Sequence, residues 1–141
     1  MASLISDLHN SLRIASSGMS IQNKRLLVVS QNLANVNTKS DTPGGDPYQR
    51  KTITFKSRKD HKTGLETVEV KGIGRDSSPF RSVYSPGDPA SNDQGYVLLP
   101  NVNAISETMD MREAGNSHEA NLKAYEKILK MMEDTIGILR N

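Results

Sequence analysis

The side chains best able to do chemistry in this sequence are its three histidines, but nothing around them completes a catalytic or metal site. His9, His61 and His118 lie far apart, and no neighbouring serine, aspartate or glutamate has the spacing of a catalytic triad. The chain contains no cysteine, which removes thiolate metal ligands, thiol nucleophiles and disulfides. We therefore expect no catalytic residues, no metal site and no enzyme activity.

Two glycine pairs are the remaining candidates for binding a nucleotide. Gly72 and Gly74 flank one isoleucine but lack the third glycine and the following helix of a dinucleotide-binding motif. Gly44 and Gly45 lie between prolines, and no lysine with a hydroxyl residue follows them as in a phosphate-binding loop. We interpret the two pairs as a strand end and a loop, and we expect neither a cofactor nor a small-molecule substrate.

Three asparagines near the end of the first predicted helix carry more specific hydrogen-bonding potential. Generic helix capping accounts for Asn37 and also fits Asn35. Asn32 lies one turn inside the helix, where asparagine is unfavourable unless its amide has a partner. Two interpretations stay open for this group, namely capping and a specific hydrogen bond between subunits.

Around these residues, the N-terminal segment shows a sustained heptad pattern that predicts a helix over residues 4–35. Its apolar residues recur at spacings of three and four, and a second row at Ile14, Ile21 and Val28 widens the apolar face. Such a helix is roughly 48 Å long, more than one small domain covers, so part of the face should meet other chains. We expect the helix to close near residues 35–38, with an asparagine in the left-handed conformation. The residues predicted to form the interface are Leu4, Leu8, Leu12, Met19, Leu26, Val29, Asn32, Leu33, Asn35 and Asn37.

The C-terminal segment repeats the pattern and predicts a helix over residues 102–139, capped by Asn101 or Asn103. Counted back from Leu122, the heptad falls out of phase near Gly115, where we expect a stutter or a break. The interface residues predicted here are Leu122, Tyr125, Leu129, Met132, Ile136 and Leu139.

Between the helices the pattern changes to a period of two. Residues 39–47 contain two prolines and two glycines and predict a loop, whereas residues 48–99 contain three or four short extended runs. A hairpin turn is expected at residues 62–64, and the strands are expected to form one small sheet that leans on a helix. The predicted fold class is α+β: long terminal helices packing as a coiled-coil-like bundle around a small antiparallel β insert. The expected segments are residues 1–38, 39–100 and 101–141.

Composition excludes several classes of protein. Hydrophobic residues make up 35% and aromatic residues only 4% of the chain, so its own core should be small and its apolar surface should need a partner. The net charge of +2 is spread along the chain without the basic and aromatic patches of a nucleic-acid binder. The longest aliphatic run covers residues 26–29, against roughly 20 residues for a membrane helix, and we expect neither membrane insertion nor a cleaved signal peptide.

Four stretches resemble the flagellar axial proteins, which are the rod, hook and hook-associated subunits of bacteria. Residues 16–38, SSGMSIQNKRLLVVSQNLANVNT, resemble the N-terminal signature of that family, and the stretch from Glu107 through HEANLKAYEKILKMMEDTIGILR, which ends at residue 140, is similar to its terminal helix. The middle stretches DPYQRK and VYSPGDPASNDQGYVLLPNVN resemble the proximal rod subunits in particular. The short chain agrees, because the distal rod and hook subunits insert larger β domains.

The resemblance implies a structural subunit exported unfolded through the flagellar type III apparatus and assembled in the periplasm. Its implied partners are copies of itself, other rod proteins and the basal-body base, in a shaft that transmits torque. The residues alone leave two other classes open: a soluble helical adaptor or export-associated binding protein, and a small enzyme. Helix length disfavours the adaptor, because a monomer would expose a large apolar surface.

Overall fold

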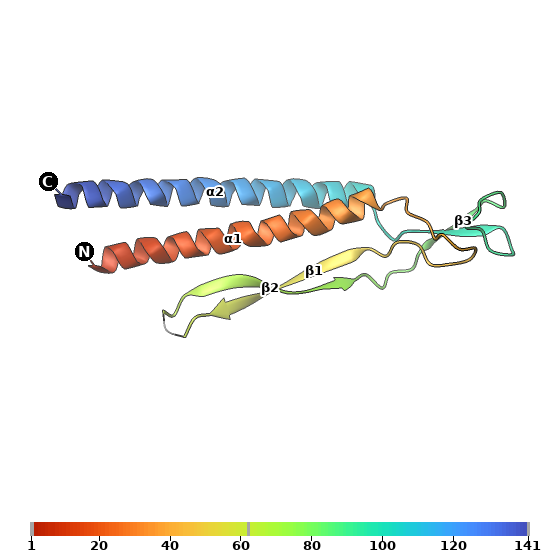
Figure 1. The fold of residues 1–141 in the computed structure, drawn as a ribbon, viewed down its shortest axis with the longest axis horizontal. Helices are drawn as coiled ribbons and strands as arrows, with labels where there is room; N and C mark the ends of the chain where they lie inside the picture. The colour runs from red at the N-terminus through yellow and green to blue at the C-terminus, as the bar shows by residue number, and fades with distance from the viewer. Residues whose placement is uncertain (1, 62, 141) are drawn as a thin grey trace. The chain divides into compact units, whose positions relative to one another are not determined.

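A computed structural model describes residues 2–61 and 63–140, so Lys62 of the expected turn lies outside it. The elements, in chain order, are α1 (Ala2–Ala34), β1 (Lys51–Lys59), β2 (Glu66–Arg75), β3 (Arg81–Tyr84), β4 (Tyr96–Leu99) and α2 (Ala104–Arg140) (Figure 1). Two long helices packed against each other, with antiparallel strand pairs between them in the sequence, confirm the predicted α+β class.

Helix α1 ends by tightening its last turn, and not through a left-handed asparagine. The N–H of Asn35 donates to the carbonyls of both Gln31 and Asn32, and the N–H of Val36 donates to that of Leu33. Among the described residues only glycines have positive φ, so the predicted left-handed closure is wrong. Bonds of the i→i+3 type satisfy the terminal carbonyls instead.

Helix α2 begins at the predicted cap and runs without interruption. The Asn103 Oδ1 accepts the backbone N–H groups of Ile105 at 3.0 Å and Ser106 at 3.3 Å, as an N-cap should. The predicted break at Gly115 is absent, because the helix is continuous from Ala104 to Arg140. A single interior glycine costs only about 1 kcal/mol, which a helix of this length tolerates.

The strands form two separate pairs, which corrects the prediction of one small sheet. β1 pairs with β2, and β3 pairs antiparallel with β4 in a register that sets Arg81 opposite Leu99 and Tyr84 opposite Tyr96. The bend between β2 and β3 is held by side chains: Gln49 and Asn101 both donate to the carbonyl of Asp76. Because the Asp76 carbonyl already accepts these side-chain hydrogen bonds, it is not available to pair with another strand. The segment after β2 therefore does not extend the first sheet.

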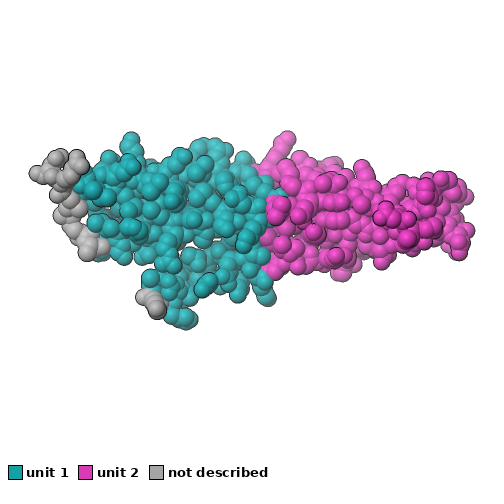
Figure 2. Space-filling model, in the orientation of Figure 1, with its two compact units in different colours: residues 1–26, 55–71, 113–141 teal, residues 27–54, 72–112 magenta. Residues whose placement is uncertain are grey.

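The chain divides into two compact units, and each contains parts of both helices (Figure 2). The first comprises residues 1–26, 55–71 and 113–141, and the second comprises residues 27–54 and 72–112. The division into residues 1–38, 39–100 and 101–141 therefore stays a prediction about sequence segments. Both cores are small and aliphatic; the first contains Leu8, Ala15, Ile21 and Ala114, and the second contains Val28, Val29, Ala90, Val97 and Val102.

In the first unit α1 lies close to α2. Gly18 gives the helices their near approach, because a Cβ built there would lie 2.7 Å from the Asn121 Nδ2 atom. Arg25 pairs with Glu113 across the same helices at 3.0 Å. On its other side α1 meets the β1–β2 hairpin, where Arg13 reaches Asp60 at 3.4 Å. One helix thus contacts both of the other parts of this unit.

Candidate functional site

The most connected polar residue in the second unit is Asn32, which is 1% exposed. Its Nδ2 donates to the Lys51 carbonyl at 2.9 Å and to the Glu107 Oε2 at 3.0 Å. Its Oδ1 accepts the Tyr48 hydroxyl and the Lys51 N–H, each at 2.9 Å. These four bonds join Asn32 to Tyr48, Lys51 and Glu107 of its own chain, which is more than a helix cap does, and its hydrogen bond between subunits stays a prediction.

Glu107 is the buried charge of this cluster, with no exposed surface. Its Oε1 accepts the Arg50 Nε at 2.5 Å, and Arg50 also reaches Asp76 at 3.4 Å and Asp110 at 3.8 Å. A buried carboxylate is tolerable only when paired and hydrogen-bonded, and here the guanidinium and the Asn32 amide supply both conditions. The cluster ties the end of α1, the start of β1 and the start of α2 together within the second unit.

The same contacts shift three pKa values. Burial raises the pKa of the Tyr48 hydroxyl, and the nearby Glu107 carboxylate raises it further. Burial would lower the pKa of Arg50, but the hydrogen bond and charge of Glu107, with those of Asp76, raise it overall. The hydroxyl and N–H of Ser78 lower the pKa of Asp76, and Arg50 adds to the effect. These pKa shifts keep Arg50 and Asp76 charged and the Tyr48 hydroxyl protonated, which suits a structural role.

Sequence reasoning missed Tyr48, Arg50 and Glu107 as a group. The available signal was the DPYQRK stretch at residues 46–51, which was noted for its resemblance and which supplies Tyr48, Arg50 and Lys51. Glu107 lies in the first turn of α2, where acidic residues are common for reasons unrelated to this cluster. Its 57-residue separation from Arg50 along the chain hides the pairing from any local pattern.

The predicted interface residues divide into three groups by burial. Leu8, Val29 and Asn32 are buried within the chain itself. Half-buried positions are Leu12, Met19, Leu26, Leu33, Asn35, Tyr125 and Met132. Exposed positions are Leu4, Asn37, Leu122, Leu129 and Ile136. The side chain of Leu139 lies outside the described part of the structure. The exposed and half-buried groups leave apolar surface available on both helices.

Further exposed apolar residues on the helices fall outside the predicted interface. They are Ile14, Leu27, Ile105, Met109, Met131 and Ile138. Ile138 and Ile105 are 77% and 74% exposed, which is unusual for isoleucine in a chain folded alone. Helical periodicity places Met131 roughly 200° around α2 from Leu129, so the helix has apolar surface on two sides.

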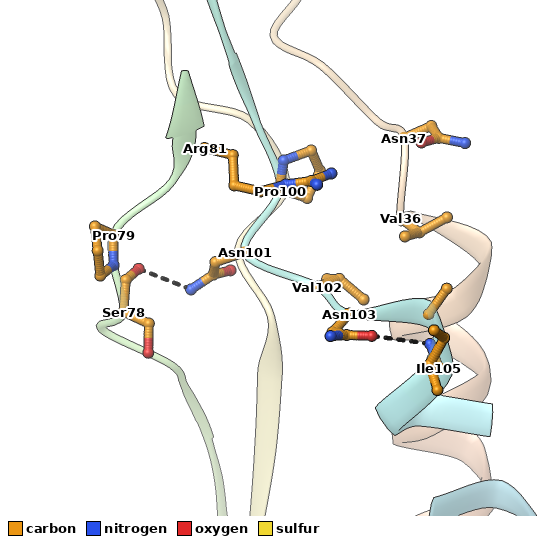
Figure 3. A pocket seen from close by; sticks show the side chains of 11 residues that line it. Val36, Asn37, Ser78, Pro79, Arg81, Pro100, Asn101, Val102, Asn103 and Ile105 are labelled. Carbon is orange, nitrogen blue, oxygen red and sulfur yellow. Dashed lines mark hydrogen bonds between the residues drawn. The ribbon is translucent and has the colours of Figure 1, made fainter. Parts of the chain in front are cut away.

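A hollow of 590 Å³ in the second unit lies where β3 and α2 begin near the end of α1 (Figure 3). Asn101 donates to the Ser78 carbonyl at 2.9 Å on one side, and Asn103 caps α2 on the other. Arg81 is the only charged residue among those lining it. Among the residues described, no group of three or more histidine, aspartate or glutamate side chains is placed to hold a metal ion. None of the described helices is long and apolar enough to cross a membrane.

Comparison with known proteins gives consistent matches along the chain. A family model for the flagella basal body rod protein matches residues 12–39. The chain is 46% identical over 128 residues to the flagellar basal-body rod protein FlgC of Agrobacterium fabrum, covering 91% of this chain and 92% of that protein. Identity is 35% to FlgC of Borreliella burgdorferi, covering 94% and 98%, and 34% to FlgC of Salmonella typhimurium, covering 92% and 96%.

Two paired long helices and these matches place the chain in the class of flagellar basal-body rod proteins. Within that class it belongs to the FlgC family, because FlgC proteins of three bacteria align with it over at least 91% of its length. The resemblance to the axial proteins is thereby confirmed.

Proposed function

We propose that this chain is a structural subunit of the flagellar basal-body rod that assembles, with copies of itself and other rod subunits, through its terminal helices. The rod role follows from membership of the FlgC family. The same role makes the chain part of the shaft that carries torque from the motor to the hook. A torque-carrying shaft requires stiffness and permanent contacts between its subunits, and it requires no covalent chemistry.

The exposed apolar side chains of the two helices carry the proposal about assembly. Leu122 and Leu129 are each 39% exposed and Ile136 is 55% exposed, at intervals of seven residues along α2. Seven residues fall about 20° short of two helical turns, so such residues form one continuous row. A row of large aliphatic side chains facing water is favourably buried against another helix, at about 25 cal/mol per Å² removed from water.

The proposal includes a location and a route. The chain would stand in the periplasmic part of the basal body and reach it through the flagellar type III export apparatus, with no segment cleaved from its N-terminus. The absence of cysteine supports this in one respect, because no disulfide forms in the chain to oppose unfolding for export. The intact mass of protein recovered from basal bodies tests the route, since a cleaved segment would lower that mass.

Complementation tests the function. A strain lacking its own FlgC gene would receive an epitope-tagged copy of this chain, and basal bodies would be isolated and imaged by electron microscopy. We expect swimming to be restored and the tag to be found in the rod. Tagged protein that stays outside the basal body while swimming is restored would instead favour an adaptor or an export-associated binding protein.

A further inference from the structure

The exposed side of α2 carries a row of glutamates directly beside its apolar row, and the first of them, Glu119, forms an exposed pair with Lys123 at 2.6 Å. Each of Leu122, Leu129 and Ile136 has a glutamate three residues before it, and all six side chains are exposed. The two rows therefore run side by side along the helix within the first unit. We call this surface the acidic stripe; its residues are Glu119, Leu122, Glu126, Leu129, Glu133 and Ile136.

A groove of 470 Å³ lies along α1 in the same unit. Its floor is formed by α1, where three serines, including the exposed Ser16 and Ser20, alternate with larger residues. Thr67 of β2 and Tyr125 of α2 also line it. Small residues flanked by two walls leave room for the side chains of an added helix. We call this surface the serine groove; its lining residues include His9, Arg13, Ser16, Ser20, Thr67 and Tyr125.

The charge around the serine groove is opposite to that of the acidic stripe. Residues 2–26 and 55–71, which form its floor and hairpin wall, contain eight lysines and arginines against four acids. Arg13 lines the groove, and the exposed Lys24 lies one turn beyond Ser20. The pair of Arg13 with Asp60 is at 3.4 Å, with 53% and 33% of the two side chains exposed. Exposed pairs contribute little, so Arg13 can exchange Asp60 for an incoming glutamate at small cost.

We propose that the acidic stripe of one copy docks in the serine groove of a second copy. This inference rests on the proposed function and names the surfaces and the partner that it uses. The apolar row would fill the space above the serines while the glutamates face Arg13 and Lys24. The chain's own α2 already supplies one wall of the groove, so the added helix comes from another molecule. The acidic stripe and the serine groove have no residue in common. When two copies dock, one copy therefore keeps an unoccupied stripe and the other keeps an unoccupied groove. The same contact then repeats from copy to copy around a ring or along a helix.

Cross-linking between two singly labelled copies tests the contact. The natural chain has no cysteine, so Ser16→Cys in one copy and Leu129→Cys in a differently tagged copy are the only thiols. Both would be expressed in the strain lacking FlgC, and isolated basal bodies would be treated with a short thiol cross-linker. We expect a dimer that carries both tags. The matched control replaces Leu129→Cys with Met131→Cys, which is exposed on the other side of α2, and should lose that dimer.

Charge reversal gives a second, independent measurement. Changing Glu119, Glu126 and Glu133 together to lysine should lower the yield of the dimer about tenfold or more, since their attraction to Arg13 and Lys24 becomes repulsion. Arg13→Glu with Lys24→Glu in the partner copy should restore it. If a cysteine variant does not enter the rod, Ser20→Cys with Ile136→Cys probes the same contact.

Three results would overturn the inference. The first is a dimer between two Leu129→Cys copies in place of the mixed dimer, and the second is capture of Ser16→Cys only by a different rod protein. The third is no dimer although both variants are found in the rod. Each of these leaves the rod function standing, because incorporation and swimming are measured separately from the cross-link.

Discussion

At the scale of single residues, Asn32 shows how one amide can fix the junction of three elements. Its oxygen and nitrogen make four hydrogen bonds, which uses the full capacity of the side chain. This explains why an asparagine, an unfavourable residue within a helix, occurs in the last turn of α1.

Asn32→Ala should destabilise the chain by about 3 kcal/mol or more, because it removes the side-chain partner of the Lys51 backbone and of the Tyr48 hydroxyl, and leaves Glu107 with Arg50 alone. Urea unfolding followed by circular dichroism measures the change. The exposed Asn37→Ala is the matched control and should alter stability by no more than about 0.5 kcal/mol. Equal effects of the two substitutions would contradict the role assigned to Asn32.

Asp76 predicts a pH dependence. Ser78 first, and Arg50 in addition, hold the pKa of Asp76 below its ordinary value of 3.8. A carboxyl with a lowered folded pKa stabilises the fold above its unfolded pKa, and loses that contribution as pH falls through the folded value. Asp76→Asn should therefore be less stable than the natural chain at about pH 6, with the difference shrinking towards about pH 3. A difference that stays constant over this range would show that the Asp76 charge contributes nothing.

At the scale of elements, α2 is a single helix because its glycines are tolerated locally, whereas Gly18 in α1 serves a contact. A Cβ at Gly115 would meet no atom within 4 Å, but one at Gly18 would meet the Asn121 side chain at 2.7 Å. Replacing Gly115 and Gly18 with a larger residue should therefore change the stability of the chain by different amounts.

Gly115→Ala should stabilise the chain by about 0.5–1 kcal/mol, through lower entropy of the unfolded chain and better helix propensity. Gly18→Ala gains the same propensity but forces Asn121 to shift, so it should be less stable than Gly115→Ala by about 1 kcal/mol. Thermal unfolding of the two variants under identical conditions measures the difference. A destabilising Gly115→Ala would mean that the helix is not continuous there in solution.

At the scale of the whole molecule, the chain leaves large aliphatic side chains on its surface that its own fold does not use. Leu129 and Ile136 are exposed, so a charge at either position costs the isolated chain little. In an assembled rod, the same charge would be buried against a neighbour and repeated at every copy, at several kcal/mol per site without a counter-ion.

Leu129→Asp and Ile136→Asp should therefore abolish swimming while leaving the circular dichroism and unfolding midpoint of the purified chain nearly unchanged. Soft-agar motility and the amount of chain in isolated basal bodies are the measurements. Lys127→Asp, also exposed on α2, is the control and should leave swimming intact. Normal swimming by both aspartate variants would rule out this row as an assembly surface.

The sequence by itself determined the two long helices, the strand-rich middle and the family. Helix periodicity is a local property, so the spacing of Leu8, Leu12 and Leu26 is enough to predict α1, and the cap of α2 is narrowed to Asn101 or Asn103. The family signal is local in the same sense, because it rests on contiguous stretches such as residues 16–38.

Only the tertiary structure decided which apolar residues are buried within the chain's own fold. The predicted row on α2 divides, with Tyr125 and Met132 half-buried and Leu122, Leu129 and Ile136 exposed. A heptad fixes which residues are apolar, but the rotation of the helix against its neighbour fixes which of two adjacent rows is covered. The partners of Asn32 and the pairing of Arg50 with Glu107 join positions up to 75 residues apart, so they depend on packing that no local pattern contains.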